Sequence, residues 1–142
     1  MSGAAVDAAD VRGWSLASGI SRIAIGLGML AAPDPALRAL GFSEVTPATA
    51  AVCRIAGIRD LVLGVVTLAG LEQRERLRAA TLANAAADAG DTLAFALALG
   101  GTERTAGARG VAAALPATVA GLWTAWRLRT CPARDRTPGC GP

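Results

Sequence analysis

The chain has 142 residues, of which 53% are hydrophobic and only 18% are charged, and its mean hydropathy is +0.44. Ordinary soluble domains have about 25% charged residues, so this composition favours a lipid environment and excludes extensive disorder. Arginine supplies all 14 positive charges, and histidine is absent. The lack of histidine excludes His-ligated metal or haem centres and Ser–His or Cys–His catalytic pairs. We predict one domain with no metal site and no cofactor.

The chain has a net charge of +3, and an excess of positive charge is typical of proteins that bind nucleic acids. Aromatic residues make up only 4% of the chain and are not interleaved with the arginines, so we predict no nucleic-acid partner. Cys53 lies in an apolar segment, whereas Cys131 and Cys140 lie in a tail rich in proline and glycine. Three scattered cysteines form neither a disulfide framework nor a zinc site, so we expect free thiols.

Four apolar segments follow an acidic, small-residue N-terminus, residues 1–13, that we expect to be flexible. Each segment has about 19 to 22 residues, close to the ~20 that cross ~30 Å of hydrocarbon as a helix. We therefore predict an all-α fold, a four-helix transmembrane bundle over residues 14–128, followed by a disordered cytoplasmic tail over 129–142. The four predicted spans are residues 14–32, 50–71, 79–99 and 110–128.

The connections between these segments are short. In the first, Asp34 suits a helix N-cap, Pro35 the first helical position and Gly41 a C-terminal stop, which predicts a short helix at the membrane surface. The second connection, residues 72–78, is a charged turn, and the third, residues 100–109, is rich in glycine and threonine.

The arginines outside the membrane predict the orientation. Eight of them lie at the N-terminus, in the second connection and around the tail, against three on the opposite side. The positive-inside rule then places the protein in the cell membrane as a multi-pass protein with both termini in the cytoplasm. The eight are Arg12, Arg74, Arg76, Arg78, Arg127, Arg129, Arg134 and Arg136, and the three are Arg38, Arg104 and Arg109.

The fourth segment has small residues at every fourth position: Ala113, Ala117, Gly121 and Ala125. A face of this kind lets a second transmembrane helix approach closely. We expect this face to pack against a membrane partner or a second copy of the chain, in addition to contact with the lipid bilayer.

Six charged residues interrupt the apolar segments. If they marked loops, the second segment would shrink to residues 61–71, about 16 Å of helix, which is half the hydrocarbon thickness. We therefore place them inside the bilayer, where each charge costs roughly 2.5–3.5 kcal/mol unless it is paired. Three arginines against three aspartates allow complete pairing. The six are Arg22, Arg54, Arg59, Asp60, Asp88 and Asp91.

Helical spacing indicates which of these side chains share a face. One stripe on the third segment holds Thr81, Asn84, Asp88, Asp91 and Phe95, and a matching stripe on the first holds Ser15, Ser18 and Arg22. The charges of the second segment are spread too widely around the helix for one face. The arrangement we expect is Asp60 facing Arg22, Arg59 facing the Asp88/Asp91 pair, and Arg54 near the membrane surface.

These motifs resemble those of a domain-of-unknown-function family of small four-helix membrane proteins from bacteria and fungi. The most specific parts are the segment at residues 54–60, with its Gly-Ile-Arg-Asp centre, and the pair Asp88 and Asp91. Further parts are the stretch from Arg22 to Gly26 and the motifs at residues 33–35 and 40–42. The resemblance implies four transmembrane helices and leaves the activity open.

The charge cluster suits several functions, of which two are ligand binding and catalysis. In the first, the protein binds a lipophilic small molecule with a polar or anionic head. The head group would be bound by Arg22, Arg54, Asp60 and Asn84. Arginine suits this role because a guanidinium forms bidentate hydrogen bonds with carboxylate or phenolate oxygens. In the second, it is a cofactor-free isomerase or cyclase in which Asp88 or Asp91 is the general acid or base and Arg59 stabilises negative charge. The same charges would also suit a proton-coupled transporter, or an accessory scaffold protein in which they form a structural clamp.

Overall fold

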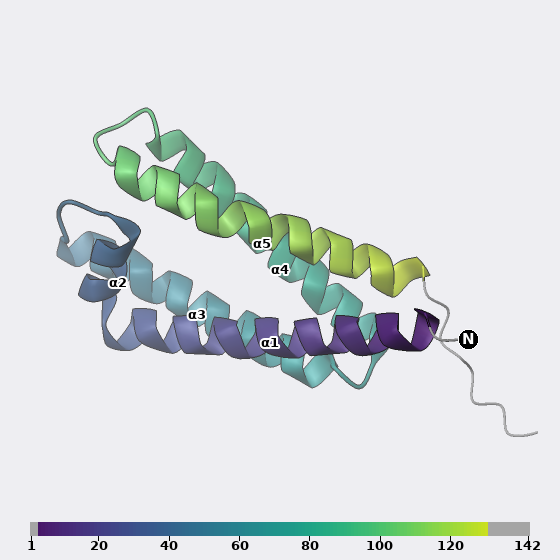
Figure 1. The fold of residues 1–142 in the computed structure, drawn as a ribbon. Helices are drawn as coiled ribbons and strands as arrows, with labels where there is room; N and C mark the ends of the chain where they lie inside the picture. The colour runs from purple at the N-terminus through teal and green to yellow at the C-terminus, as the bar shows by residue number, and fades with distance from the viewer. Residues whose placement is uncertain (1–2, 131–142) are drawn as a thin grey trace, which may run out of the picture.

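The computed structural model describes residues 3–130 of the chain, with side chains over 10–129. These residues form five α-helices and no strand, so the all-α prediction is confirmed. The helices are α1 (Gly3–Ala31), α2 (Pro33–Leu40), α3 (Pro47–Gly70), α4 (Arg74–Ala98) and α5 (Arg104–Thr130), labelled in Figure 1.

The helices are longer than the apolar segments. Helix α1 begins at Gly3, so it extends eleven residues before Trp14, where the first predicted span begins. Most of the predicted charged turn belongs to α4, which begins at Arg74, because Arg, Glu, Leu and Ala all favour helix. Helix α5 continues to Thr130, and the predicted disordered tail otherwise lies outside the described residues.

The short helix α2 has the predicted place and the predicted end. Gly41 ends it with a left-handed φ of 100°, and the Gly41 N–H donates to carbonyls of the last turn. The predicted start is wrong by two residues. Ala32 is the N-cap and Pro33 already lies in the helix, so Asp34 is a residue of the first turn and not the cap. A proline at the first helical position needs no N–H partner, which suits Pro33 to this place.

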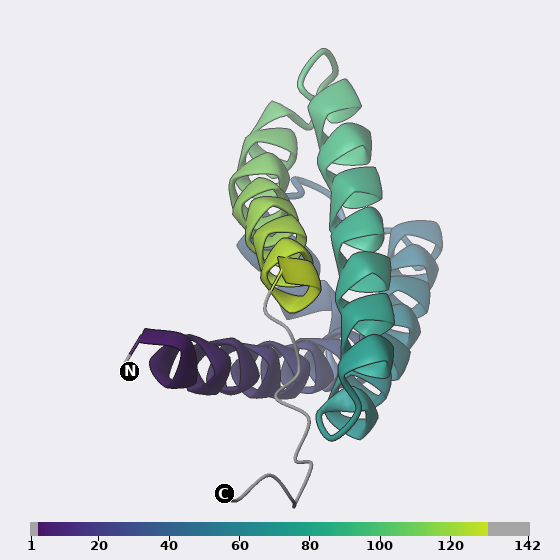
Figure 2. The same cartoon turned by 90° about the vertical axis from the view of Figure 1, so that its right-hand side faces the viewer.

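The four long helices form two antiparallel pairs, α1 with α3 and α4 with α5 (Figures 1 and 2). Contacts between the pairs run mainly from α3 to α4. The start of α1, the α3–α4 turn and the end of α5 lie at one end of the molecule, and α2 and the α4–α5 turn lie at the other (Figure 1).

Polar contacts join neighbouring segments at both ends of the molecule. Near α2, the Ser43 hydroxyl donates to Glu103 Oε1 over 2.6 Å, and an Arg109 N–H donates to the Ala39 carbonyl over 3.0 Å. At the opposite end, Arg74 Nε donates to the carbonyl oxygen of Leu128 over 2.7 Å.

Glycines let the backbones of α1 and α3 touch. A Cβ added to Gly26 would lie 2.6 Å from the carbonyl oxygen of Gly57, and one added to Gly64 would lie 2.8 Å from that of Gly19. On each helix the two glycines are seven residues apart and therefore share a face. We call Gly19, Gly26, Gly57 and Gly64 the glycine seam.

A second set of close approaches joins α4 and α5. A Cβ on Gly110 would lie 2.1 Å from the ring of Phe95, and one on Gly121 would lie 3.0 Å from the Ala85 Cβ. Ala125 is buried as well. Two members of the predicted small-residue face, Gly121 and Ala125, are therefore used within the chain.

Burial is inverted relative to a water-soluble protein. The largest fully buried side chains are Thr67 and Thr124, and the buried apolar residues are mostly alanines. Large apolar side chains lie instead on the outside of all four long helices. The most exposed of them include Ile20, Leu27, Val52, Ile55, Val62, Leu93, Leu97, Val119 and Trp126.

By length and composition, one described segment, Asp10–Ala31, can cross a membrane. This supports one of the four predicted spans. Helix α3 carries three charged residues, Arg54, Arg59 and Asp60, and the polar stripe of α4 lowers the hydropathy of that helix.

Candidate functional site

The charged side chains of α1, α3 and α4 meet between the two helix pairs. Arg22 Nη1 lies 3.1 Å from Asp60 Oδ1, so the predicted pairing of these two residues is confirmed. The other terminal nitrogen of Arg22, Nη2, pairs with Asp88 Oδ2. Arg22 on α1 therefore bridges a carboxylate of α3 and a carboxylate of α4.

Arg59 makes the second bridge between α3 and α4. Its two terminal nitrogens lie 2.6 and 2.7 Å from the two oxygens of Asp91, which is a bidentate pair. Nη2 of Arg59 also lies 3.1 Å from Asp60 Oδ1. The prediction that Arg59 would face both α4 carboxylates is correct for Asp91 and wrong for Asp88. The two carboxylates are three residues apart, about 4.5 Å along the helix, and each reaches a different neighbouring helix.

Arg22, Asp60 and Asp88 are the buried end of the ion-pair cluster, with side chains 11%, 11% and 10% exposed. Arg59 and Asp91 are the outer end, about one third exposed. The five-residue cluster holds three carboxylates and two guanidiniums, and each guanidinium is paired. Arg54 is exposed on α3 and is not among the ion pairs that the described residues form.

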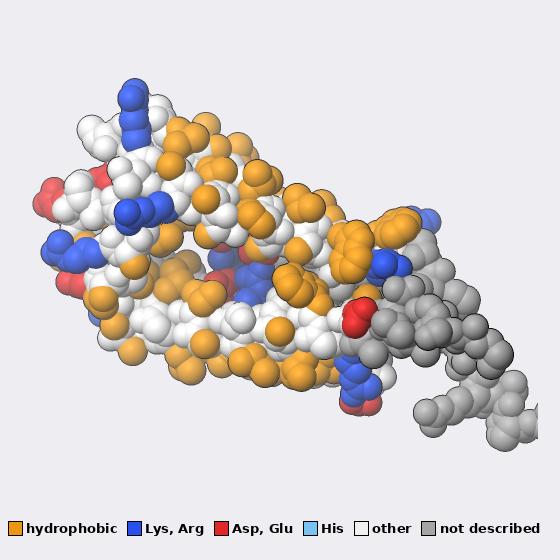
Figure 3. All heavy atoms as spheres, viewed as in Figure 1, with side chains coloured by type: hydrophobic (Ala, Val, Ile, Leu, Met, Phe, Trp, Pro, Cys, Tyr) orange, Lys and Arg blue, Asp and Glu red, His pale blue; other side chains and the backbone are white. Residues whose placement is uncertain are grey.

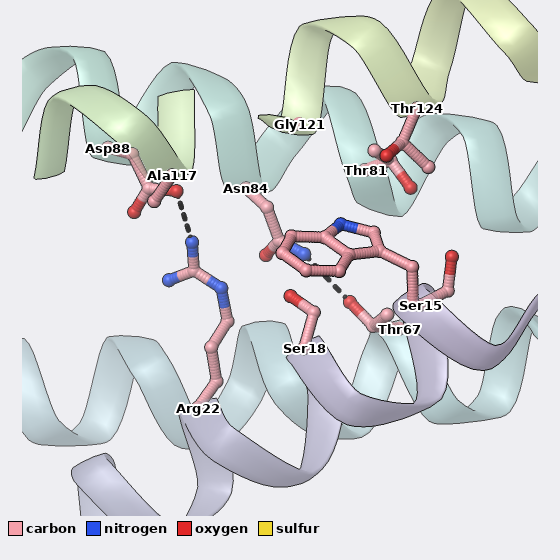
Figure 4. A pocket seen from close by; sticks show the side chains of 11 residues that line it. Ser15, Ser18, Arg22, Thr67, Thr81, Asn84, Asp88, Ala117, Gly121 and Thr124 are labelled. Atoms are coloured by element: carbon pink, nitrogen blue, oxygen red, sulfur yellow. Dashed lines mark hydrogen bonds and ion pairs between the residues drawn. The ribbon is translucent and has the colours of Figure 1, made fainter. Parts of the chain in front are cut away.

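A cavity of about 60 Å³ adjoins the buried end of this cluster. All four long helices line it, and eight of its eleven lining residues have polar side chains. Figure 4 shows the lining side chains around this space, and Figure 3 shows charged atoms at the floor of a hollow between α1 and α5. The lining residues are Trp14, Ser15, Ser18, Arg22, Thr67, Thr81, Asn84, Asp88, Ala117, Gly121 and Thr124.

The cavity separates the predicted site residues into two groups. Arg22, Asn84 and Asp88 line it. The other four, Arg54, Arg59, Asp60 and Asp91, are not lining residues. Of the three residues predicted to be catalytic, Asp88 alone reaches the cavity.

Sequence reasoning missed several lining residues. Thr67 lies seven residues after Asp60 on α3, so helical spacing could have placed it on the same face. Thr124 lies seven residues after Ala117, on the small-residue face of α5. The sequence did not identify Trp14 as a lining residue, because a tryptophan at the end of a membrane span is common whether or not a pocket is present.

Four of the hydroxyls that line the cavity donate to their own helices. Those of Ser15, Thr67, Thr81 and Thr124 each donate to the carbonyl four residues earlier, over 2.7–2.8 Å. Their donors are therefore used, and their oxygens keep the capacity to accept. The Thr67 oxygen already accepts from Asn84 Nδ2 over 2.9 Å, a bond that joins α3 to α4.

Two buried atoms at the cavity have no hydrogen-bond partner among the residues that the structure describes. They are Asn84 Oδ1 and Arg22 Nε. Asn84 is only 6% exposed, so water outside the protein does not satisfy its oxygen. A buried polar atom without a partner costs about 1–3 kcal/mol, so each of the two atoms calls for an explanation.

A protein-family model described as "Domain of unknown function (DUF4267)" matches residues 19–127. No curated protein and no solved structure matches the chain. The matched residues include the whole ion-pair cluster, whereas Trp14, Ser15 and Ser18 precede them.

Proposed function

Since the chain belongs to the DUF4267 family, whose function is unknown, we propose a function from its own geometry. The protein is a four-span integral membrane protein whose cavity binds a lipophilic small molecule through the polar head group of that molecule. The observation that carries the proposal is a polar, partly unsatisfied cavity enclosed by helices whose outer surfaces are apolar.

The distribution of side chains supports the membrane location. Apolar side chains on the outside of α1, α3, α4 and α5 would cost free energy in water, at about 25 cal/mol per Å² of apolar surface. Lipid removes this cost. The charges that lower the hydropathy of α3 and α4 are paired between helices, which lowers the cost of placing them in hydrocarbon.

The two ends of the molecule support the orientation. Arg12, Arg74 and Arg129 lie at the end that holds the start of α1 and the end of α5, and Arg38 and Arg104 lie at the other. The excess of arginines at the first end supports a cytoplasmic location for both termini and a location of the protein in the cell membrane.

The size of the cavity supports a ligand that enters only in part. A water needs about 10–15 Å³ of such space, so 60 Å³ accommodates a head group and not a whole lipophilic molecule. The hydrocarbon part of the ligand then lies outside the cavity, between the helices and the lipid. Ala117 on α5 is both exposed and part of the lining, so it stands where the head and the hydrocarbon part meet.

Filling the cavity tests this proposal. Ala117→Leu adds three carbons at the lining, whereas Ala113→Leu makes the same change one turn earlier, at an exposed residue outside the lining. The wild type and both variants are purified from membranes in mild detergent, and solvent extracts of each are compared by mass spectrometry. We expect a lipophilic compound that co-purifies with the wild type and with Ala113→Leu and is at least tenfold depleted in Ala117→Leu.

Two results would contradict the proposal. One is release of the protein from membranes by alkaline carbonate, because an integral protein stays with the pellet. The other is the same set of extracted compounds, at the same ratio to protein, in all three preparations.

A further inference from the structure

We infer that the head group is a hydroxyl, so that the ligand is a lipophilic alcohol that reaches the cavity from the bilayer between α1 and α5. This inference rests on the proposed function and specifies its ligand. It follows from the hydrogen-bonding capacity that the cavity leaves unused.

The two unpartnered atoms require opposite partners. Arg22 Nε is a donor and needs an acceptor, and Asn84 Oδ1 is an acceptor and needs a donor. A hydroxyl group supplies both functions on one oxygen. Figure 4 shows Arg22, Ser18 and Asn84 around the same space, and all three line the cavity.

The remainder of the lining also favours a hydrogen-bond donor. The hydroxyls of Ser15, Thr81 and Thr124 donate hydrogen bonds to backbone carbonyls, and their oxygens can still accept. Asp88 adds a carboxylate to the same wall. A head group that brings its own O–H finds several acceptors here.

An anionic head is disfavoured by the charges at the cavity. Arg22 is the lining arginine, and it is already paired with both Asp60 and Asp88. The predicted carboxylate or phenolate ligand would therefore meet no unpaired guanidinium and would lie beside the carboxylate of Asp88. A cationic head is disfavoured because an ammonium group has no lone pair with which to accept from Arg22 Nε.

The surface of the molecule indicates the route. The hollow in Figure 3 lies between α1 and α5 and has charged atoms at its floor. Trp14 on α1 and Ala117 on α5 both line the cavity and are both exposed. A chain-bearing alcohol can therefore place its hydroxyl at the cavity while its hydrocarbon part remains in lipid.

Trp14 provides a reporter for binding. In the Trp123→Phe/Trp126→Phe background it is the single tryptophan of the chain. This protein is placed in phosphatidylcholine nanodiscs and titrated with dodecan-1-ol, dodecanoate, dodecylammonium or dodecane, while Trp14 emission is recorded. We expect saturable binding of dodecan-1-ol, with at least tenfold weaker binding of the other three.

Two variants connect the signal to the cavity. Asn84→Leu removes the unpartnered acceptor at similar volume, and we expect about a tenfold loss of affinity for dodecan-1-ol, the effect of one hydrogen bond of about 1.4 kcal/mol. If Asn84→Leu does not fold, Ala117→Leu tests the same point by filling the lining. Ala113→Leu is the matched control and should bind as the background protein does.

The outcomes separate this inference from the proposed function. Tighter, variant-sensitive binding of dodecanoate or dodecylammonium would overturn the hydroxyl and leave the lipophilic ligand in place. Equal variant-sensitive binding of all three polar probes would also overturn the hydroxyl. A signal that is insensitive to Asn84→Leu and Ala117→Leu for every probe would overturn both, because the cavity would then hold water alone.

Discussion

At the scale of single residues, Asp60 holds the ion-pair cluster together. Its Oδ1 atom accepts from Arg22 over 3.1 Å and from Arg59 over 3.1 Å, so one carboxylate serves two guanidiniums from two helices. The residue is 8% exposed. Without Asp60, Arg22 keeps its pair with Asp88 and Arg59 keeps its pair with Asp91, so the loss is that of charge-assisted hydrogen bonds and not of a whole ion pair.

Asp60→Ala should therefore lower the free energy of unfolding by about 1.5–3 kcal/mol. Thermal or denaturant unfolding of the protein in a mild detergent measures this loss. Asp34→Ala, at an exposed residue in the first turn of α2, is the control and should change the free energy of unfolding by less than about 1 kcal/mol. Equal stability of the two variants would show that the cluster does not stabilise the fold.

The Arg59–Asp91 pair allows a second test of the ion-pair cluster, because both residues can be replaced together. Arg59→Met and Asp91→Leu should each destabilise the protein, since the first leaves Asp91 without an arginine and the second leaves Arg59 with Asp60 alone. The double variant should be more stable than the sum of the two losses predicts, by about 1–3 kcal/mol. A double-mutant cycle of unfolding free energies measures this coupling, and strict additivity would contradict it.

At the scale of helices, two kinds of contact hold the helices together. Within the α1–α3 pair, the glycine seam brings backbones into contact, and van der Waals packing of this kind drives helix association where lipid removes the hydrophobic effect. Between the two pairs, the bridges to Asp88 and Asp91 and the Asn84–Thr67 hydrogen bond provide directional contacts. The cavity lies where directional contacts replace close packing.

Two glycines of α1 test the seam. A Cβ on Gly26 would lie 2.6 Å from a carbonyl oxygen of α3, whereas a Cβ on Gly28 would meet nothing within 4 Å. Gly26→Ala should destabilise the protein by about 1–3 kcal/mol, as overpacking does. Gly28→Ala should be neutral or stabilise it by up to about 1 kcal/mol, because alanine favours helix. Unfolding midpoints in detergent measure both, and a similar effect of the two changes would contradict the seam.

At the scale of the whole molecule, the polar interior and the apolar exterior agree with the proposed membrane location. The polar contacts between the two helix pairs include the ion-pair cluster, and further polar contacts lie at the two ends of the molecule. If the protein crosses the membrane four times, its two ends lie in different compartments, and the turns of each end share one compartment.

Cysteine labelling tests this arrangement. Single cysteines at Gln73, in the α3–α4 turn, and at Thr102, in the α4–α5 turn, are introduced into a chain with Cys53→Ala, Cys131→Ser and Cys140→Ser. In intact cells, a membrane-impermeant maleimide should label Thr102→Cys. It should label Gln73→Cys only after the membrane is opened. Labelling of both cysteines in intact cells, or of neither, would contradict the four-span topology.

Local sequence determined most of the helical architecture. The apolar runs predicted four long helices, and the sequence Pro-Asp-Pro to Gly41 predicted the short helix between the first two. Spacing predicted the polar stripe of α4 and the Arg22–Asp60 pair, because residues three, four or seven apart must share a helix face. The ends of the helices were less predictable, since residues 3–13 and 74–78 are helical by propensity and not by apolar pattern.

Tertiary structure decided which groups meet and which remain unsatisfied. Sequence could not separate Asp88 from Asp91, because which neighbouring helix each one reaches depends on how α4 crosses α1 and α3. Nor could it find the glycine seam or the unpartnered Asn84 oxygen, which exist only once helices lie against each other. Helix formation is a local property of the chain, whereas pairing and cavities depend on distances between segments far apart in sequence.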